Sequence, residues 1–229
     1  MNKKKLVFLS GAGMSSESGI STFRDSGGLW EQYRIEEVAT PEAFEKNPEL
    51  VLEFYNQRRK QLDKVEPNLG HKIIAELQQE FDVTIITQNV DNLHERAGSK
   101  NILHLHGELI KVRSTKHPEL IYDIGTKEIK IGDLCDKGSQ LRPHIVWFGE
   151  AVPSIEEAVP IVNSADIFVV IGTSLNVYPA AGLIMYAKHD TPKYLIDPNN
   201  VDVPYGLNFS IIKKQAEEGM EELKQLITK

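Results

Sequence analysis

The sequence predicts an α/β protein with a Rossmann-like, doubly wound parallel sheet and a small inserted second lobe. Three observations carry this prediction. Short runs of β-branched and large apolar residues recur along the chain of 229 residues, and most are continuously apolar, as in parallel strands covered on both faces. Helical patterns lie between several of these runs. Two stretches interrupt the alternation, and they predict the second lobe.

Six strands and two helices follow from these patterns. The strands are expected at residues 6–10, 83–88, 102–106, 167–172, 194–197 and 209–213. Asn68 is placed to cap a helix whose apolar side chains are Ile73, Ile74, Leu77 and Phe81. A second helix near the C-terminus carries the apolar stripe Met220, Leu223 and Ile227. The chain is expected to be a single domain over residues 1–229, with small-lobe insertions at roughly 31–66 and 108–142.

Charge and composition limit the classes of binding partner that are expected. The net charge is −7 and the pI about 5.6, which argues against a nucleic acid or an anionic membrane surface as the partner. No apolar run approaches the ~20 residues of a membrane span, and the first apolar run is read as a buried strand rather than a secretory signal. The single cysteine, Cys135, fits a reducing compartment, so a cytoplasmic protein is expected. The sequence makes no prediction about oligomeric state.

A glycine loop follows the first strand. In Gly11-Ala12-Gly13, glycine would let the backbone approach a pyrophosphate. Ser16 stands where the common dinucleotide fingerprint has its third glycine, and no strand follows soon enough to supply an acidic ribose ligand, so a plain dehydrogenase is disfavoured. A turn without a ligand is the alternative. Small polar residues and then Phe23-Arg24 follow, a mixture suited to a loop that closes over a dinucleotide.

Further polar side chains follow other strands. Carboxyl ends of strands in open α/β sheets face the ligand crevice. Gln88, Asn89 and Asp91 end the second strand, where they are suited to amide and hydroxyl groups or, alternatively, to capping a helix; His94 is read as structural. The segments 172–174 and 197–199 follow two other strands. Several such junctions on one sheet suggest one extended ligand.

Two histidines lie in the third strand. With a period of two, His104 and His106 share one face, and either is a candidate general base. His106 lies nearer the end of the strand and precedes Gly107, which leaves room for a substrate. A buried, hydrogen-bonded histidine remains the alternative for His104.

Together these motifs resemble those of the sirtuins, the NAD-dependent protein-lysine deacylases. The matching stretches are residues 11–30, 88–91, 103–107, 146–150 and 172–175, in the family's order. The resemblance implies NAD as cofactor, acylated lysine in proteins or peptides as substrate, and release of nicotinamide and O-acyl-ADP-ribose. ADP-ribosyl transfer or NAD hydrolysis at the same site, and a non-enzymatic NAD-sensing module, are the alternatives.

The resemblance also implies site residues. The catalytic residues would be His106, as general base, and Asn89. NAD would contact Gly11, Ala12, Gly13, Ser15, Glu17, Thr22, Phe23, Arg24, Trp30, Gln88, Asn89, Val90, Asp91, Gly172, Thr173, Ser174, Asp197, Pro198, Asn199 and Ala216. The substrate peptide would pair with Val146, Trp147, Phe148 and Gly149 by strand addition.

One departure from the family concerns zinc. Sirtuins usually hold a structural zinc with four cysteines, but Ser114 stands where a cysteine would be expected and only Cys135 remains. Cys135 with His117 would supply two of four ligands, so zinc is not expected. The lobe would then be held by packing in a short hairpin that carries Ile121, Tyr122, Ile124, Ile129, Ile131 and Leu134.

A charge interrupts one apolar helix face. In the helix expected at residues 49–62, Val51, Tyr55, Arg58 and Leu62 form the apolar stripe, with Arg59 to one side. A buried arginine needs an anionic partner, and an internal glutamate is one possibility. Tyr55 and Arg58 also resemble the pair found in sirtuins that remove acidic acyl groups. This implies desuccinylase or demalonylase activity beside deacetylase activity.

Overall fold

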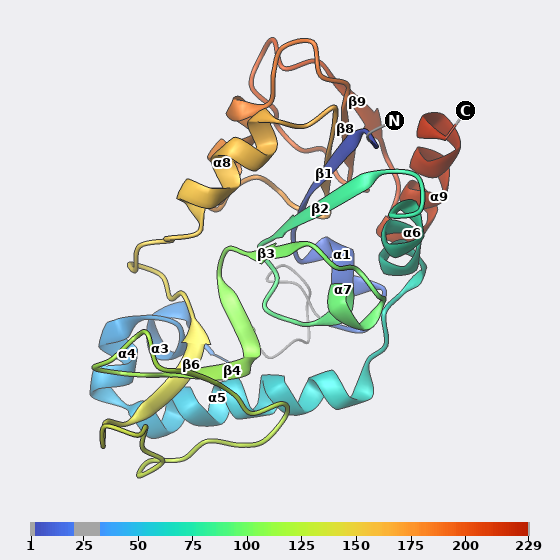
Figure 1. The fold of residues 1–229 in the computed structure, drawn as a ribbon. Coiled ribbons are helices and arrows are strands. Elements are labelled where there is room, and N and C mark those ends of the chain that lie inside the picture. Colours follow the sequence, from blue (N-terminus) through green and yellow to red (C-terminus); the bar gives the residue numbers. More distant parts are fainter. Residues whose placement is uncertain (1–2, 21–32, 229) are drawn as a thin grey trace.

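The computed structural model describes residues 3–20 and 33–228, which form two lobes (Figure 1). The larger lobe contains a six-stranded sheet in the order β3-β2-β1-β7-β8-β9, and all its pairings are parallel. The strands are β1 (Lys5–Ser10), β2 (Asp82–Thr87), β3 (Ile102–His104), β7 (Ile167–Ile171), β8 (Lys193–Ile196) and β9 (Phe209–Ile212). The strand order reverses between β1 and β7, which is where doubly wound sheets open a ligand crevice. The predicted fold class is confirmed.

Helices cover both faces of this sheet. On one face lie α6 (Leu69–Leu77) and α9 (Ala216–Ile227), and on the other lie α8 (Ile155–Asn163) and the 3-10 helix η2 (Ala180–Tyr186) (Figure 1). In β1, Leu6 and Phe8 pack against the first pair, whereas Val7 and Leu9 pack against the second. This two-sided burial explains the continuously apolar strands. Asn68 caps α6 as predicted, because its Oδ1 accepts a hydrogen bond from the His71 N–H at 3.2 Å.

The small lobe combines a three-stranded antiparallel sheet with helices. The sheet has the order β5-β4-β6, and the strands are β4 (Gly107–Ser114), β5 (Ile121–Asp123) and β6 (Leu141–Ile145). The helices are α3 (Ile35–Val38), α4 (Pro41–Lys46) and α5 (Pro48–Gln61), followed by the 3-10 helix η1 (Leu62–Lys64). Phe54 and Tyr55 of α5 pack with Leu109, Ile145 and Trp147. Segments far apart in the sequence therefore share one core.

The prediction that a short hairpin holds the small lobe together is wrong. Ile121, Ile131 and Leu134 are 44%, 50% and 55% exposed, and only Ile129 of the expected set is fully buried. It packs with Leu52 of α5 and Val112 of β4. The reason is that β5 pairs with β4 instead of folding back on residues 129–134. Alternation within one segment cannot indicate that its partner strand lies elsewhere.

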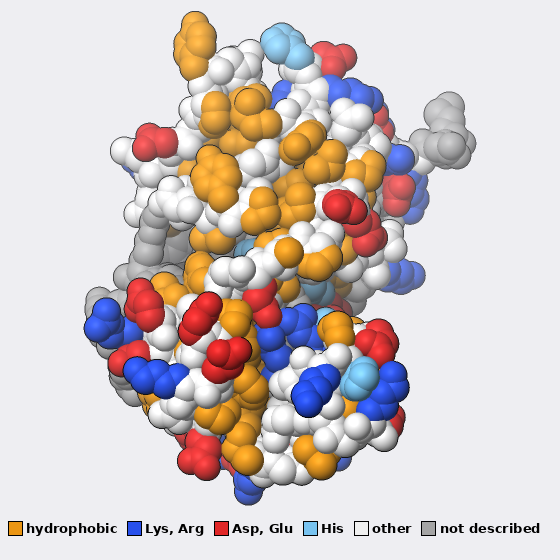
Figure 2. Space-filling view, turned by 90° about the vertical axis from the view of Figure 1, so that its left-hand side faces the viewer, with side chains coloured by type: hydrophobic (Ala, Val, Ile, Leu, Met, Phe, Trp, Pro, Cys, Tyr) orange, Lys and Arg blue, Asp and Glu red, His pale blue; other side chains and the backbone are white. Residues whose placement is uncertain are grey.

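Two surface features bear on partners. No helix within residues 3–20 and 33–228 is long and apolar enough to cross a membrane. Figure 2 views the side on which α8 and part of the small lobe lie; hydrophobic side chains dominate its upper part, and acidic and basic side chains are interspersed over its lower part. This face therefore presents no continuous basic surface.

Candidate active site

Two glycine loops meet where the strand order reverses. The Gly11 N–H donates to the Ile171 carbonyl at 3.0 Å, and the Gly13 N–H donates to the Gly172 carbonyl at 2.8 Å. A Cβ on Gly13 would lie 2.8 Å from the Gly172 Cα. Gly172 also has a φ of +62°, a conformation that side chains rarely adopt. The loops after β1 and β7 are therefore in backbone contact, and the short helix α1 (Gly13–Ser16) leads away from them.

A buried polar network joins the first loop to the end of β2. The Asn89 Nδ2 donates to the Ser15 Oγ at 3.1 Å, and this hydroxyl donates to the Asp91 Oδ2 at 3.0 Å. The other Asp91 oxygen accepts from the Leu93 N–H at 3.1 Å, just before α7 (Leu93–Arg96); the N-cap of this helix is Asn92, whose side chain makes no capping hydrogen bond, so the capping alternative is wrong. Burial raises the pKa of Asp91. Each network residue has a side chain suited to a hydroxyl or amide of a ligand.

The third junction joins the same network. The Gln88 Nε2 donates to the Thr173 Oγ1 at 3.1 Å, which links the end of β2 to the loop after β7. Val90 accepts at its carbonyl from the Leu109 N–H at 2.8 Å, and so ties this segment to β4. The predicted residues at three strand ends are therefore brought together.

His106 lies at the centre of this arrangement. Its Nδ1 is 3.1 Å from the Gln88 carbonyl oxygen, which can only accept, so Nδ1 carries the proton. Burial lowers the pKa of His106, so the ring is neutral near pH 7 and its Nε2 lone pair is available as a base. The expectation that His104 and His106 share one strand face is wrong. Strand β3 ends at His104, because the chain bends before Gly107 begins β4.

Further predicted cofactor residues lie after β8 and at the start of α9. Asp197 follows β8, and its Oδ1 accepts from the Asn199 N–H at 2.9 Å. Ala216 is buried at the start of α9, where the Glu217 N–H donates to the Glu17 Oε2 at 2.9 Å. Thr22, Phe23, Arg24 and Trp30 lie outside the described residues.

The segment predicted to bind the peptide is not a strand. Residues 146–149 follow β6 as irregular structure and a turn. The N–H groups of Val146, Trp147 and Phe148 donate to the His106 carbonyl, the Glu150 carboxylate and the Ala39 carbonyl at 2.9, 2.8 and 3.0 Å. A peptide that pairs with residues 146–148 would therefore have to use their carbonyl groups.

Helix α5 carries the residues predicted for the acyl pocket, and the burial of its two arginines differs from the prediction. The arginine that is fully buried is Arg59, whereas Arg58 is half-buried. Arg59 donates to the Leu109 carbonyl and the Asn56 Oδ1, both at 2.7 Å, so its partners are neutral oxygens and not a glutamate. The apolar stripe predicted the wrong buried arginine because β4 covers α5 on a second side.

Tyr55 and Arg58 are neighbours on this helix. The Arg58 Cζ lies 5.9 Å from the centre of the Tyr55 ring and 5.8 Å from that of Phe54. Burial raises the pKa of Tyr55 to about 12, so its hydroxyl keeps its proton. Burial lowers the pKa of Arg58, and the negative charge of Asp91 opposes this change. The pair presents a cation and a hydroxyl donor together.

Sequence patterns did not reveal a buried cluster beneath the site. The Ser10 Oγ donates to the Thr87 Oγ1 at 2.8 Å and lies 3.2 Å from the His94 Nε2. The rings of His71 and His94 are 4.8 Å apart. The signal in the sequence that could have revealed this cluster is Ser10, a hydroxyl residue at the end of an otherwise apolar strand. His94 is structural, as expected.

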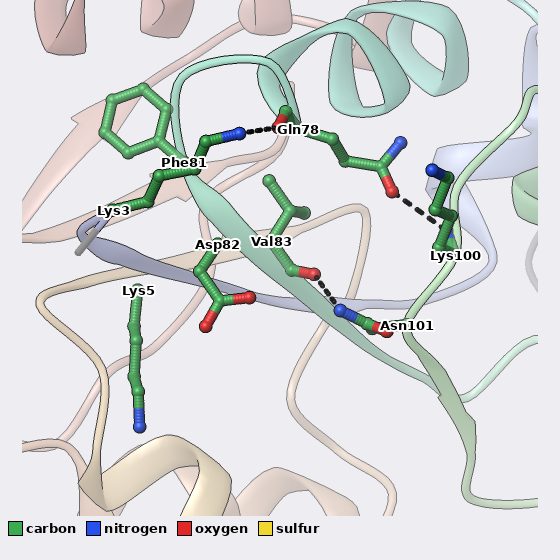
Figure 3. Close-up of a pocket in the computed structure, with 8 residues that line it drawn as sticks. All are labelled: Lys3, Lys5, Gln78, Phe81, Asp82, Val83, Lys100 and Asn101. Carbon is green, nitrogen blue, oxygen red and sulfur yellow. Dashed lines mark hydrogen bonds between the residues drawn. The ribbon is translucent and has the colours of Figure 1, made fainter. Parts of the chain in front are cut away.

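A shallow pocket at the amino ends of the strands is a poor candidate for the active site. Figure 3 shows its lining, which comes from the amino ends of β1 and β2 and from the loop before β3. Lys3, Lys5 and Lys100 line it. Ligands of parallel α/β sheets bind at the carboxyl ends of the strands, and His106 lies at that end.

The zinc expectation concerns the small lobe. The buried Cys135 donates its Sγ hydrogen to the Ser114 Oγ at 3.3 Å. Within the described part of the chain, the group of three metal-ligating side chains that lie within 4.8 Å of one another contains neither Cys135 nor His117. Absence of zinc stays a prediction.

Known proteins resemble this chain in sequence over most of its length. Residues 11–179 match the model of the Sir2 family. A Bacteroides thetaiotaomicron protein named NAD-dependent protein deacylase is 59% identical, with 98% of each chain covered. A Helicobacter pylori protein of the same name is 55% identical, with 96% of each chain covered.

Solved structures give the same result. A complex of a mutant Sir2 homologue with ADP ribose has a TM-score of 0.89 and 42% identity, with 97% of this chain and 91% of that chain covered. A Sir2 homolog–NAD complex has a TM-score of 0.86 and 42% identity, with 99% and 90% covered. From its sequence, its fold and these relatives, the chain belongs to the Sir2 family.

Proposed function

We propose that the whole chain acts as one catalytic domain, an NAD-dependent protein-lysine deacylase of the cytoplasm. The observation that carries this proposal is the neutral His106, whose Nε2 is available beside the two glycine loops and the Asn89 network. The names of the Bacteroides and Helicobacter relatives support the same reaction.

The residues at the strand ends fit NAD. Glycine at positions 13 and 172 lets the two loops meet backbone to backbone at the switch point, where parallel α/β sheets bind dinucleotides. Gln88, Asn89 and Asp91 offer amide and carboxylate groups for the nicotinamide end, and Asp197 and Asn199 offer polar groups for the adenosine end. When bound, NAD supplies a glycosidic carbon that becomes electrophilic as nicotinamide leaves.

His106 is the general base of this proposal. The Gln88 carbonyl accepts the hydrogen bond from Nδ1, and so fixes both the tautomer and the direction of the ring. The free Nε2 then takes a proton from a ribose hydroxyl. General-base assistance of this kind is worth ~10²–10⁴ in rate.

Tyr55 and Arg58 extend the proposal to acidic acyl groups. A guanidinium can hold a carboxylate with two charge-assisted hydrogen bonds, and the protonated Tyr55 hydroxyl can donate another. Succinyl- and malonyl-lysine would therefore be substrates beside acetyl-lysine.

The test is product analysis by mass spectrometry. The protein is incubated with NAD and acetyl-, succinyl- or malonyl-lysine peptides, and nicotinamide and O-acyl-ADP-ribose are measured with and without peptide. The expected result is peptide-dependent formation of both products by the native protein and by a His189→Ala control, in which an exposed histidine is removed, but not by His106→Ala.

Two other results would refute the proposal. Nicotinamide release that does not need peptide would indicate ADP-ribosyl transfer or NAD hydrolysis. NAD binding without any product would indicate a sensing module.

A further inference from the structure

We propose that His104 is a positioning residue: as an imidazolium it bridges the Asn89 carbonyl to the Glu95 carboxylate, and NAD affinity falls when this bridge loses its proton. The inference rests on the proposed function, because it assigns a task at the same site.

The contacts of His104 require two ring protons. Its Nδ1 lies 3.0 Å from the Asn89 carbonyl oxygen, and its Nε2 lies 2.7 Å from the Glu95 Oε1. A carbonyl and a carboxylate only accept hydrogen bonds, whereas a neutral imidazole has one N–H to donate. The imidazolium alone satisfies both contacts.

The charges around His104 favour this form. Burial would lower the pKa of His104, but the hydrogen bond and charge of Glu95, aided by Glu108, outweigh it and raise the pKa. Burial would likewise raise the pKa of Glu95, but His104 outweighs it and lowers the pKa. The titratable groups that face His104 are Glu95 and His94 on α7, Asp91 before it, and Glu108 and Lys111 on β4. Lys111 pairs with Glu108 at 2.7 Å, which leaves Glu95 as the main partner.

A metal site is the competing explanation for the same side chains. Glu95, His104 and Glu108 each offer one ligand atom within 4.8 Å of the others, and they are the group of this kind found in the described part of the chain. Because Nδ1 faces the Asn89 carbonyl, a metal would need the lone pair of Nε2, and Nε2 instead lies 2.7 Å from the Glu95 Oε1, which is the distance of a hydrogen bond. The arrangement therefore fits a charged bridge.

The bridge acts on the segment that carries Asn89. The Asn89 side chain is held by Ser15 at 3.1 Å and its N–H by the Thr87 hydroxyl at 3.1 Å, so His104 holds its remaining backbone polar group. His106 holds the preceding carbonyl, that of Gln88. Loss of a proton from His104 leaves one N–H for two acceptors, so the Asn89 carbonyl and the Glu95 carboxylate can no longer both be held, and this segment is fixed less firmly.

The two histidines thus need opposite protonation states. His106 must be neutral, and burial lowers its pKa, so its base form persists below the ordinary histidine range. The His104 bridge is present below its raised pKa and is lost as the pH rises through it. Activity is expected in the window between the two, with His106 on the acid side and His104 on the alkaline side.

The test is the pH dependence of the NAD dissociation constant by calorimetry and of kcat and KM. On the alkaline side, NAD affinity of the native protein should fall about tenfold, the scale of one charge-assisted hydrogen bond. Glu95→Gln should move this fall to lower pH. His104→Gln should weaken NAD binding about tenfold below the His104 pKa, should match the native protein above it, and should therefore lack the alkaline fall, while kcat changes little.

Glu66→Gln is the matched control, because it removes another ion pair to α7, that of Glu66 with Arg96 at 2.8 Å. It should keep the native profile. The proposal would be overturned if the alkaline fall in NAD affinity occurred at the same pH in Glu95→Gln as in the native protein. It would also be overturned if Glu66→Gln shifted the pH of this fall as much as Glu95→Gln does.

Nitrogen-15 NMR of the imidazole rings gives a readout independent of activity. The His104 signal, assigned by its loss in His104→Gln, should show both nitrogens protonated at pH 7. One unprotonated nitrogen in the native protein would end the inference, whatever the activity of the variants. If these results hold but no acyl transfer occurs, the deacylase proposal fails and the role of His104 in NAD binding stands.

Discussion

Replacing Arg58 with methionine tests the acyl pocket. Methionine keeps an unbranched, apolar side chain of similar reach and removes only the charge and the hydrogen-bond donors. Acetyl-lysine has no carboxylate, so its turnover should change little. Succinyl-lysine would lose its ionic partner, and its kcat/KM should fall far more.

The size of this difference follows from the surroundings of Arg58. The guanidinium is half-buried near the rings of Phe54 and Tyr55, so bulk water screens it only in part. A hydrogen bond to a charged group is worth about 1.5–3 kcal/mol, or roughly 10- to 150-fold in kcat/KM. The deacetylase rate should fall less than about threefold, since Met still fills the space.

The assay measures kcat/KM on matched acetyl and succinyl peptides of one sequence. Lys60→Met serves as the control, because it removes an exposed cation from the same helix, one that pairs with Glu128. It should leave both activities unchanged. Equal losses on the two substrates for Arg58→Met would refute the reasoning, as would a selective loss in the control.

Three further predictions concern the base, the loops and one helix cap. His106→Ala should lower kcat by ~10²–10⁴ while calorimetry still detects NAD binding. In the native protein the rate should fall as the pH drops through the lowered His106 pKa. A rate that does not change over this pH range would contradict the assignment of His106 as the base. Gly172→Ala should lower the free energy of unfolding in urea by more than about 1 kcal/mol, because φ is +62° and the new Cβ would lie 2.3 Å from the Met14 nitrogen. Asn68→Ala should lower it by about 1–2 kcal/mol, because the side chain caps α6 through the His71 N–H and donates to the Met14 carbonyl at 2.8 Å; no loss of stability would show that water replaces the cap.

Local patterns were sufficient for the parts of the molecule that local forces govern. Continuous apolar runs indicated strands buried on both faces, and β1 confirms the reason, since its successive side chains pack into two different cores. Asn68 marked a helix start because its side chain satisfies a nearby N–H. The glycines of the first loop predicted a backbone approach to a pyrophosphate, which stays a prediction; their contact with Gly172 in the loop after β7 was not indicated by the sequence.

Packing between distant segments settled the rest. A single stripe on α5 pointed to Arg58 as the buried arginine, but β4 covers another side of that helix and buries Arg59. A period of two put His104 and His106 on one face, yet the chain bends between them to begin the small lobe. Their charges depend on which acceptors the fold brings to each ring: a carbonyl alone for His106, and a carbonyl with a carboxylate for His104. A proton is held or lost according to such neighbours, and no pattern along the chain contains them.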